Sequence, residues 1–150
     1  MKRLLAIVFI GLFATTAGAE TAADTTGELR FELADMPDLS EFRWKNRPVV
    51  VFADSDADPA FIEQMALLQA RPGTLAERDV VVLTDTDPAA KHPLRLKMRP
   101  RGFMLVLVGK DGGIKLRKPF PWSVREISRS IDKMPMRQRE IREEKAASGG

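Results

Sequence analysis

The sequence predicts an α/β fold in which a βαβ half is followed by a ββα half, giving a mixed sheet with helices on both faces. Three short apolar runs have the length and composition of strands buried on both faces; they are Val49–Ala53, Val80–Leu83 and Phe103–Val108. A segment of helical periodicity lies between the first two runs, as a parallel βαβ unit requires. The turn dipeptide Asp111-Gly112 after the third run predicts an antiparallel hairpin.

The chain begins with the three parts of a secretory signal peptide. Lys2 and Arg3 make a positive start, Leu4–Phe13 is apolar, and small residues ending in Ala19 make a cleavage motif. The apolar run is about half as long as a membrane-spanning helix needs. We therefore expect cleavage after Ala19 and a periplasmic or secreted protein, the alternative being an uncleaved membrane anchor.

Composition excludes several classes of function. With no cysteine, the chain has no disulfide, no thiolate metal site and no thiol redox chemistry. Removing residues 1–19 would take away two of the 24 basic residues and none of the 21 acidic ones, so the net charge would fall from +3 to about +1. This near balance predicts no nucleic-acid partner. The remaining 131 residues fit one domain with a sizeable core.

The first half of the chain divides as follows. Residues 20–38 are expected to form a flexible lead, although Glu28–Leu33 alternates weakly, as in a short strand. The globular domain is expected over residues 39–134. Its first helix has Asp58 as N-cap and Pro59 at the first helical position, and it continues through Ala70. Its apolar stripe consists of Phe61, Ile62, Met65 and Leu68.

The second half contains a short helix, an edge strand and a long helix. Prolines leave room for a helix at about Leu94–Met98. Ile114–Arg117 alternates apolar and basic residues, which is typical of a half-exposed edge strand. Ser123 and Glu126 form a capping box at the start of the last helix. Residues 135–150 are expected to form a charged C-terminal helix or tail.

Three stretches together resemble a known family: Phe42–Pro48, Gly109–Leu116 and Ile131–Arg137. The family is a thioredoxin-like domain of unknown function, found in short secreted proteobacterial proteins and in vertebrate sushi-repeat matrix proteins. The resemblance covers about Leu39–Ile141. It implies a thioredoxin-like fold and export, and it implies no activity, because none is assigned to the family.

The chain departs from redox thioredoxins at two places. Their dithiol follows the first buried strand, where this chain has the acidic loop Asp54–Asp58. They also carry a proline directly before the third such strand, where this chain has Gly102 and Phe103. The departures predict a protein that does no thiol redox chemistry, and the sequence indicates no cofactor.

The acidic loop is a candidate metal site. Asp54, Asp56 and Asp58 alternate as in the opening of a calcium-binding loop, but Pro59 and Met65 stand where such a loop needs glycine and glutamate. The competing interpretation is that these acids cap the following helix. A further alternative is a hydrolase or cation-dependent enzyme that uses the loop, with Asp56 or Asp58 as the acid or base.

Other catalytic candidates have less support in the sequence. Ser55 lacks the surroundings of a nucleophile. His92, the only histidine, follows Asp85 and Asp87 at a spacing that matches no ligand pattern, so we expect it in a surface loop.

A basic stretch without acidic residues is the candidate binding site. It contains Lys91, Arg95, Lys97, Arg99 and Arg101. Such a patch would suit an anionic envelope component or an acidic protein face, the alternative being an ordinary solvated surface. If these side chains face solvent, the double change Arg95→Glu with Arg99→Glu should leave the domain folded.

Trp44 is the second candidate for binding. It stands among Arg43, Lys45 and Arg47, as in an aromatic and basic binding motif. The alternative, that Trp44 packs where its segment docks on the sheet, is commoner for a tryptophan. Taken together, the sequence predicts an exported, thiol-free binding or interaction module, with the acidic-loop enzyme as the alternative.

Overall fold

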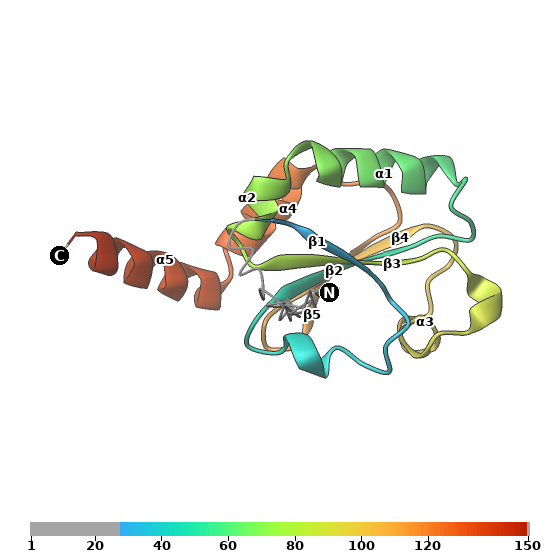
Figure 1. Ribbon diagram of the computed structural model, residues 1–150, viewed down its shortest axis with the longest axis horizontal. Coiled ribbons are helices and arrows are strands. Elements are labelled where there is room, and N and C mark those ends of the chain that lie inside the picture. Colours follow the sequence, from blue (N-terminus) through green and yellow to red (C-terminus); the bar gives the residue numbers. More distant parts are fainter. Residues whose placement is uncertain (1–27, 150) are drawn as a thin grey trace, which may run out of the picture.

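The computed structural model describes residues 28–149; the predicted signal peptide and its cleavage site lie outside them. Within this range five strands form one sheet in the order β1-β3-β2-β4-β5 (Figure 1). The strands are β1 (Arg30–Leu33), β2 (Arg47–Phe52), β3 (Val80–Asp85), β4 (Met104–Val108) and β5 (Ile114–Lys118). β1, β3 and β2 run parallel, whereas β4 and β5 are antiparallel to their neighbours. This is the predicted mixed sheet.

Helices cover both faces of the sheet. The helices are α1 (Pro59–Ala70), α2 (Pro72–Ala76), α3 (Pro93–Met98), α4 (Val124–Asp132) and α5 (Pro135–Ser148), with short 3-10 turns η1 (Ser40–Phe42) and η2 (Pro88–Ala90). None of the described helices is long and apolar enough to cross a membrane. α1, α2 and α4 contribute to the core on one face, and η1 and α3 contribute to the core on the other.

The central strands supply both cores because side chains alternate along a strand. Val49 and Val51 face α1, α2 and α4, while Val50 and Phe52 face η1 and α3. All six residues of β2 are buried. The continuous apolar run at this position is therefore explained by burial on both faces, as the sequence predicted.

α1 begins and ends where predicted, but its buried face differs from the prediction. Ile62 is 56% exposed, and Gln64 is fully buried in its place. The amide of Gln64 explains the difference. Its Nε2 donates to the carbonyl of Trp122 at 2.9 Å, and its Oε1 accepts from the N–H of Trp122 at 2.7 Å. A buried polar side chain with both partners satisfied costs little, and it ties α1 to the segment before α4.

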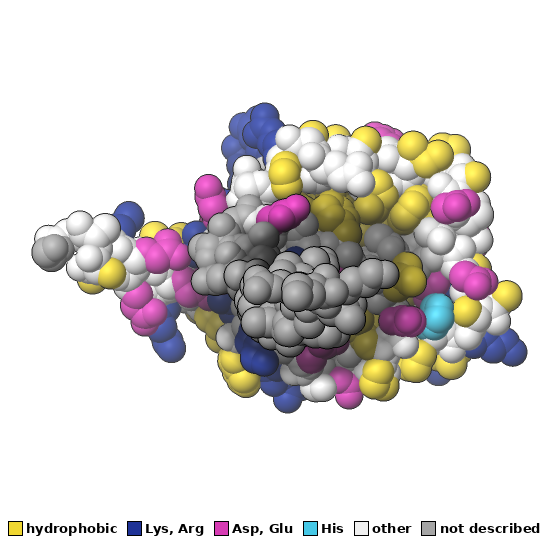
Figure 2. Space-filling view, viewed as in Figure 1, with side chains coloured by type: hydrophobic (Ala, Val, Ile, Leu, Met, Phe, Trp, Pro, Cys, Tyr) yellow, Lys and Arg dark blue, Asp and Glu magenta, His cyan; other side chains and the backbone are white. Residues whose placement is uncertain are grey.

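The two ends of the described chain also differ from the expected domain limits. Residues 30–33 fall within the expected flexible lead, yet they form β1 and pair along their whole length with β3. Residues 135–148 form α5, which projects from the body of the molecule in Figure 1. Both acidic and basic side chains lie along it in Figure 2. α5 is nevertheless tied to the sheet by ion pairs that cross the expected boundary at residue 134.

Candidate functional site

Arg95 is buried where β2 and β3 end, and it does not face solvent as the sequence predicted. Its Nε and Nη2 donate to the two carboxylate oxygens of Asp85 at 3.0 and 3.2 Å. Nη2 also donates to the carbonyl of Ala53 at 2.7 Å, and the guanidinium lies 5.5 Å from the ring centroid of Phe52. The prediction of Arg95 as a surface binding residue is wrong, because the buried carboxylate of Asp85 requires this cation as its partner.

The acidic loop serves the helix that follows it. The Oδ1 of Asp58 accepts the N–H of Ala60 at 2.8 Å, which is the capping bond that the sequence predicted. Asp54 is exposed and lies 4.0 Å from Nη1 of Arg95. Over residues 28–149 no three acidic or histidine side chains gather to hold a metal ion. The structure therefore does not bring Asp54, Asp56 and Asp58 together as a cation site.

The remaining catalytic candidates, His92 and Ser55, also lack hydrogen-bonded partners of a catalytic kind among the described residues. His92 is half-buried at the start of α3, and its side chain makes no capping bond. Ser55 is exposed, and its carbonyl accepts the N–H of Asp58 at 3.3 Å. The hydrogen bonds found among the described residues join neither side chain to a base or a nucleophile.

Four members of the predicted basic stretch remain at the surface. Lys91, Lys97, Arg99 and Arg101 are all exposed. Lys91 and Arg99 end η2 and α3 in the left-handed conformation, with φ of 49° and 51°. A further basic residue borders this region, since Arg117 of β5 donates to the carbonyl of Met98 at the end of α3.

A cavity of about 210 Å³ lies between the η1 segment, α3 and the β4–β5 hairpin. Two basic residues from distant parts of the sequence line it, Arg43 and Lys97, together with the polar residues Asp38 and Ser40. The rest of the lining is mostly apolar: Leu39, Leu94, Met98, Val108 and Ile114. The fold thus brings the Arg43 segment beside the basic stretch of α3.

Asp38 is the one acidic residue among those lining this cavity. Hydrogen bonds from Ser40 hold the pKa of Asp38 below its usual value, and the nearby charges of Lys97 and Arg43 lower it further. The carboxylate of Asp38 is engaged by the backbone N–H of Ser40 at 2.8 Å. Two cations therefore face one carboxylate that is already hydrogen-bonded, which leaves the cavity with an excess of positive charge.

Trp44 is 62% exposed, which contradicts the interpretation that it packs against the sheet. Its backbone is held in the left-handed conformation, with φ of 66°, and its N–H donates to the carbonyl of Lys110 at 2.7 Å. This bond fixes the segment against the hairpin while the indole points to solvent. We call the surface formed by Arg43, Trp44 and Lys97 the basic face.

Arg43 reaches across the turn of the hairpin. A Cβ atom at Gly112 would lie 3.2 Å from Nη2 of Arg43, and Gly112 has φ of 83°. The turn needs glycine for its backbone conformation, and the missing side chain leaves the space that the guanidinium of Arg43 occupies. The Asp111-Gly112 turn is thus part of the basic face as well as a connection.

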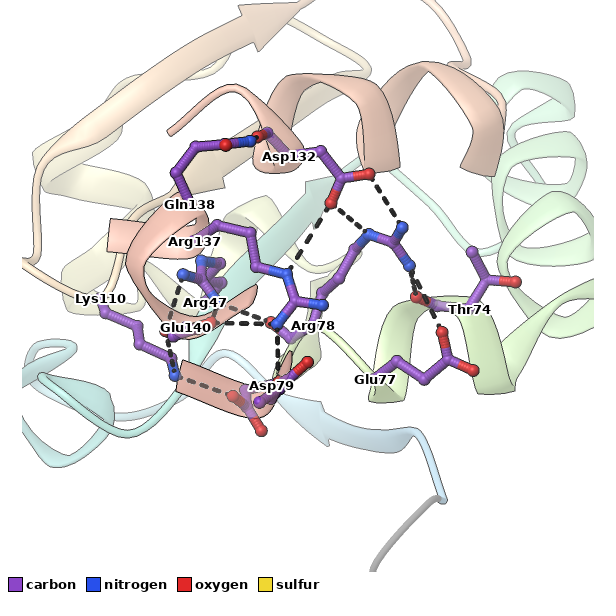
Figure 3. Close-up of polar contacts among 11 residues, drawn as sticks. Arg47, Thr74, Glu77, Arg78, Asp79, Lys110, Asp132, Arg137, Gln138 and Glu140 are labelled. Atoms are coloured by element: carbon purple, nitrogen blue, oxygen red, sulfur yellow. Dashed lines mark hydrogen bonds and ion pairs between the residues drawn. The ribbon is translucent and has the colours of Figure 1, made fainter. Parts of the chain in front are cut away.

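A second polar cluster, which the sequence did not predict, joins α5 to the sheet (Figure 3). Arg47 is 1% exposed, and its Nη1 and Nη2 donate to Glu140 at 3.2 and 3.0 Å. Lys110 lies 2.7 Å from Glu140 and 2.7 Å from Asp79. Burial alone would raise the pKa of Glu140, but the hydrogen bonds from Arg47 and Lys110 outweigh it and lower the pKa to about 2.

The same cluster continues to α2 and α4. Nε and Nη2 of Arg78 both lie 2.9 Å from the carboxylate of Asp132. Arg137 binds Glu140 and Glu144, each at 3.2 Å, and these bonds raise the pKa of Arg137 although burial opposes the rise. The available signal in the sequence was the run of opposite charges in 137–145, which identifies a helix but not the residues that it contacts.

A cavity of about 340 Å³ lies beside this cluster, between the hairpin and the start of α5. Its lining includes Arg47, Lys110, Lys115 and Arg139. The first three are already paired, Arg47 and Lys110 with Glu140, and Lys115 with Asp111 at 2.9 Å. The charged residues of this cluster therefore hold α5 to the sheet. The basic face is the stronger candidate for binding.

Comparison with known proteins places most of these elements in one family. A family described as "Domain of unknown function (DUF4174)" matches residues 38–140. A relative from Danio rerio, coiled-coil domain-containing protein 80, is 29% identical over 133 residues, which cover 69% of this chain. The matched part is 15% of that relative, so the chain spans a small fraction of its length.

Two solved structures from Plasmodium yoelii are similar to this chain. One is Prx1a modified at its N-terminus, which forms an artifactual octamer, with a TM-score of 0.51 and 16% identity. The other is thioredoxin peroxidase I, with a TM-score of 0.52 and 17% identity. Each match covers 67% of this chain and 79% of the other. At such identity the likeness shows the fold alone, and it confirms the predicted thioredoxin-like fold.

Proposed function

The chain belongs to the DUF4174 family, as its three sequence motifs indicated, and from that premise we propose that it is an exported, thiol-free module that binds an acidic partner. One observation carries the proposal. The cavity at the basic face unites Arg43 and Lys97, two cations separated in sequence by β2, α1, α2, β3 and η2. Two cations that converge on an open hollow form a local positive field, although the chain as a whole is near charge balance.

The composition of the basic face suits an acidic protein segment. The guanidinium of Arg43 can bind a carboxylate through two parallel hydrogen bonds, and the ammonium of Lys97 can bind a second carboxylate as a point charge. Trp44, which follows Arg43 in the chain, adds a large exposed aromatic side chain, and tryptophan and arginine are the residues that most often dominate protein interfaces. The apolar floor of the cavity would accept a small apolar side chain between the two acidic ones.

Binding is preferred to catalysis because two of the three loop carboxylates have structural partners. Asp58 is the N-cap of α1 and Asp54 lies beside Arg95, which leaves Asp56 as a single exposed carboxylate without a second one to act with it. The acidic loop, which stands where thioredoxins carry their thiols, lies beside the buried pair of Arg95 and Asp85. The ion pair of Arg95 and Asp85 stabilises the ends of β2 and β3. This structural role is sufficient to explain why the two charged residues are there.

Export rests on the signal at the start of the sequence. Intact-mass measurement of the protein recovered from the cell envelope or the medium should find Glu20 as the first residue. A cytoplasmic protein that retains residues 1–19 would contradict this part of the proposal and would leave the binding part to be judged on its own test.

The binding proposal is tested with poly-aspartate as the probe and with vesicles of anionic lipid as a second probe. Poly-aspartate should bind at low salt, and binding should weaken as salt rises from about 50 to about 300 mM, because the Debye length becomes shorter than the span of the basic face. The variant Arg43→Glu with Lys97→Glu should lose binding. Binding of the vesicles with no binding of poly-aspartate would identify a lipid surface in place of an acidic protein.

A matched control uses the opposite side of the sheet. Arg125 and Arg129 are exposed on α4, so Arg125→Glu with Arg129→Glu changes the net charge equally without touching the basic face. This control should bind poly-aspartate as the unchanged protein does, apart from a small general effect of net charge. Equal losses in both double variants would mean that only net charge matters, and the basic face would then have no specific role.

A further inference from the structure

β1 is an edge strand whose outer side pairs with no other strand of the described chain. The N–H of Ala34 donates to the carbonyl of Thr84 on β3 at 2.8 Å. This bond shows which alternate residues of β1 direct their backbone groups toward β3. In a parallel pair, alternate residues direct both their N–H and their C=O to the neighbouring strand. Arg30 and Glu32 therefore face β3, and Leu29, Phe31 and Leu33 direct their backbone groups outward.

The side chains of β1 divide between the two faces of the sheet. Arg30 lies on the η1 side, where it donates to Asn46 at 3.4 Å and stands 5.9 Å from the ring centroid of Phe42. Its other contact is an ion pair with Glu32 at 3.5 Å. Phe31 and Leu33, which are 40% and 69% exposed, lie on the α1 side.

An apolar hollow of about 410 Å³ runs between β1 and α1, lined by Phe31, Leu33, Phe61 and Met65 among others. Figure 2 shows hydrophobic side chains gathered between α1 and the strands. An exposed edge with unpaired backbone groups beside an apolar hollow is a site for the addition of another strand.

We propose that the strand added to β1 is β1 of a second copy of this chain, antiparallel, with the two-fold axis at Phe31. In this register each Phe31 faces Phe31 of the partner subunit. Leu29 faces Leu33 of the partner subunit. These are the residues whose backbone groups are directed outward, so the pairs exchange six hydrogen bonds in a hydrogen-bonded register.

The same register matches the charges. Arg30 stands opposite Glu32 of the partner subunit, and Glu32 stands opposite Arg30 of the partner subunit. Backbone geometry allows any antiparallel register that pairs the outward-directed residues with one another, and charge complementarity, an independent observation, selects the axis at Phe31 among these registers. The two aromatic rings and the two Leu33 side chains would join the apolar hollows of the subunits into one surface.

The opposite edge of the sheet does not offer a comparable site. β5 carries Lys115, Arg117 and Lys118 with no acidic residue, so two copies of β5 would repel each other. β1 carries one cation and one anion, which attract their counterparts only in the antiparallel register just described. The dimer would therefore form one continuous sheet across the two copies of β1.

Sedimentation velocity of the purified protein over a concentration series tests the proposal. A reversible dimer is expected, and it should be weak, because a four-residue strand buries little surface. Glu32→Arg and Arg30→Glu each place like charges opposite one another twice across the axis, so each should raise the dissociation constant about tenfold. The swap of both residues, Arg30→Glu with Glu32→Arg, restores both pairs and should restore the dimer.

Hydrogen exchange checks the register. The amides of Phe31 and Leu33 should become protected as the protein concentration rises, whereas the amide of Ala34, bonded to Thr84, should be protected at every concentration. Glu143→Arg on α5 makes the same charge change at an exposed site away from β1, and it should leave the dimer unchanged.

Three results would overturn the proposal. They are a protein that is monomeric throughout the series, a dimer that is indifferent to charge at Arg30 and Glu32, and a charge swap that fails to restore association. Because both side chains are exposed or half-exposed, these changes should not prevent folding, and circular dichroism of each variant verifies this.

Discussion

Arg47 and Glu140 are 93 positions apart in sequence, yet they form a two-pronged ion pair with nitrogen to oxygen distances of 3.2 and 3.0 Å. Arg47 begins the central strand β2, and Glu140 lies in the middle of α5. The pair holds a projecting helix to the centre of the sheet, and it does so through a cation that is 1% exposed. Removing Glu140 leaves the buried cation of Arg47 without its counterion, and removing Arg47 takes the central-strand cation away from Glu140.

The first prediction concerns acid. Because the pKa of Glu140 is lowered to about 2 in the folded state, its contribution to stability is fully present above its unfolded value of 4.5 and is lost as the pH falls towards 2. Glu140→Gln should destabilise the domain by about 2–3 kcal/mol at neutral pH. Urea unfolding of both proteins between about pH 7 and about pH 2 measures this, and a difference that does not shrink below about pH 4 would contradict it.

The second prediction separates the pair from its members. Arg47→Met alone should cost about 3 kcal/mol, because it leaves Glu140 beside Arg137 and Lys110 without its main partner. The double variant Arg47→Met with Glu140→Leu should lie closer to the unchanged protein than either single variant, since no charge remains unpaired. Thermal unfolding of the unchanged protein, the two single variants and the double variant measures the four stabilities. If the stability losses of the two single variants simply add in the double variant, Arg47 and Glu140 are not coupled.

The third prediction corrects the expectation for the basic stretch. Arg95→Glu should destabilise the domain by more than about 3 kcal/mol, because it would bury a second carboxylate against Asp85. Arg99→Glu, at an exposed position, should change stability by less than about 0.5 kcal/mol. Chemical unfolding compares the two directly. An Arg95→Glu variant with unchanged stability would mean that the ion pair with Asp85 does not contribute to the stability of the domain.

The fourth prediction concerns the acidic loop. Asp58→Ala should cost about 1 kcal/mol, because it removes the acceptor for the N–H of Ala60. Asp56→Ala serves as the control, since Asp56 is exposed and caps no helix, and it should change stability little. Calcium at about millimolar concentration should leave the melting temperature of the unchanged protein almost constant. A large rise that disappears in Asp56→Ala would establish a cation site.

The strands and the first helix could be predicted because their causes are local. Continuous apolar runs such as Val49–Ala53 are required by burial on both faces, and Asp58 with Pro59 is a capping signal contained in two residues. β1 is harder to predict because it is only four residues long, and its short alternation of apolar and charged residues does not reveal that it pairs with the distant strand β3.

The functional surfaces depend on contacts between distant segments, which a single sequence does not reveal. The sequence places Arg95 among four other basic residues, and only the fold shows that Asp85 lies against it. Trp44 looked like a packing residue by its type, yet its positive φ and its bond to Lys110 turn the indole outward. The proximity of Arg43 and Lys97 likewise depends on how η1 and α3 meet over the sheet.

The position of Glu140, 93 residues after Arg47, has a consequence for the order of folding. A polypeptide is synthesised from its N-terminus, so β2 and the neighbouring strands exist long before α5 does. Until residue 140 is delivered, the cation of Arg47 has no carboxylate from α5 to neutralise it and is costly to bury. We therefore expect a nascent chain to hold its central strand less firmly until α5 has been made and Glu140 can pair with Arg47.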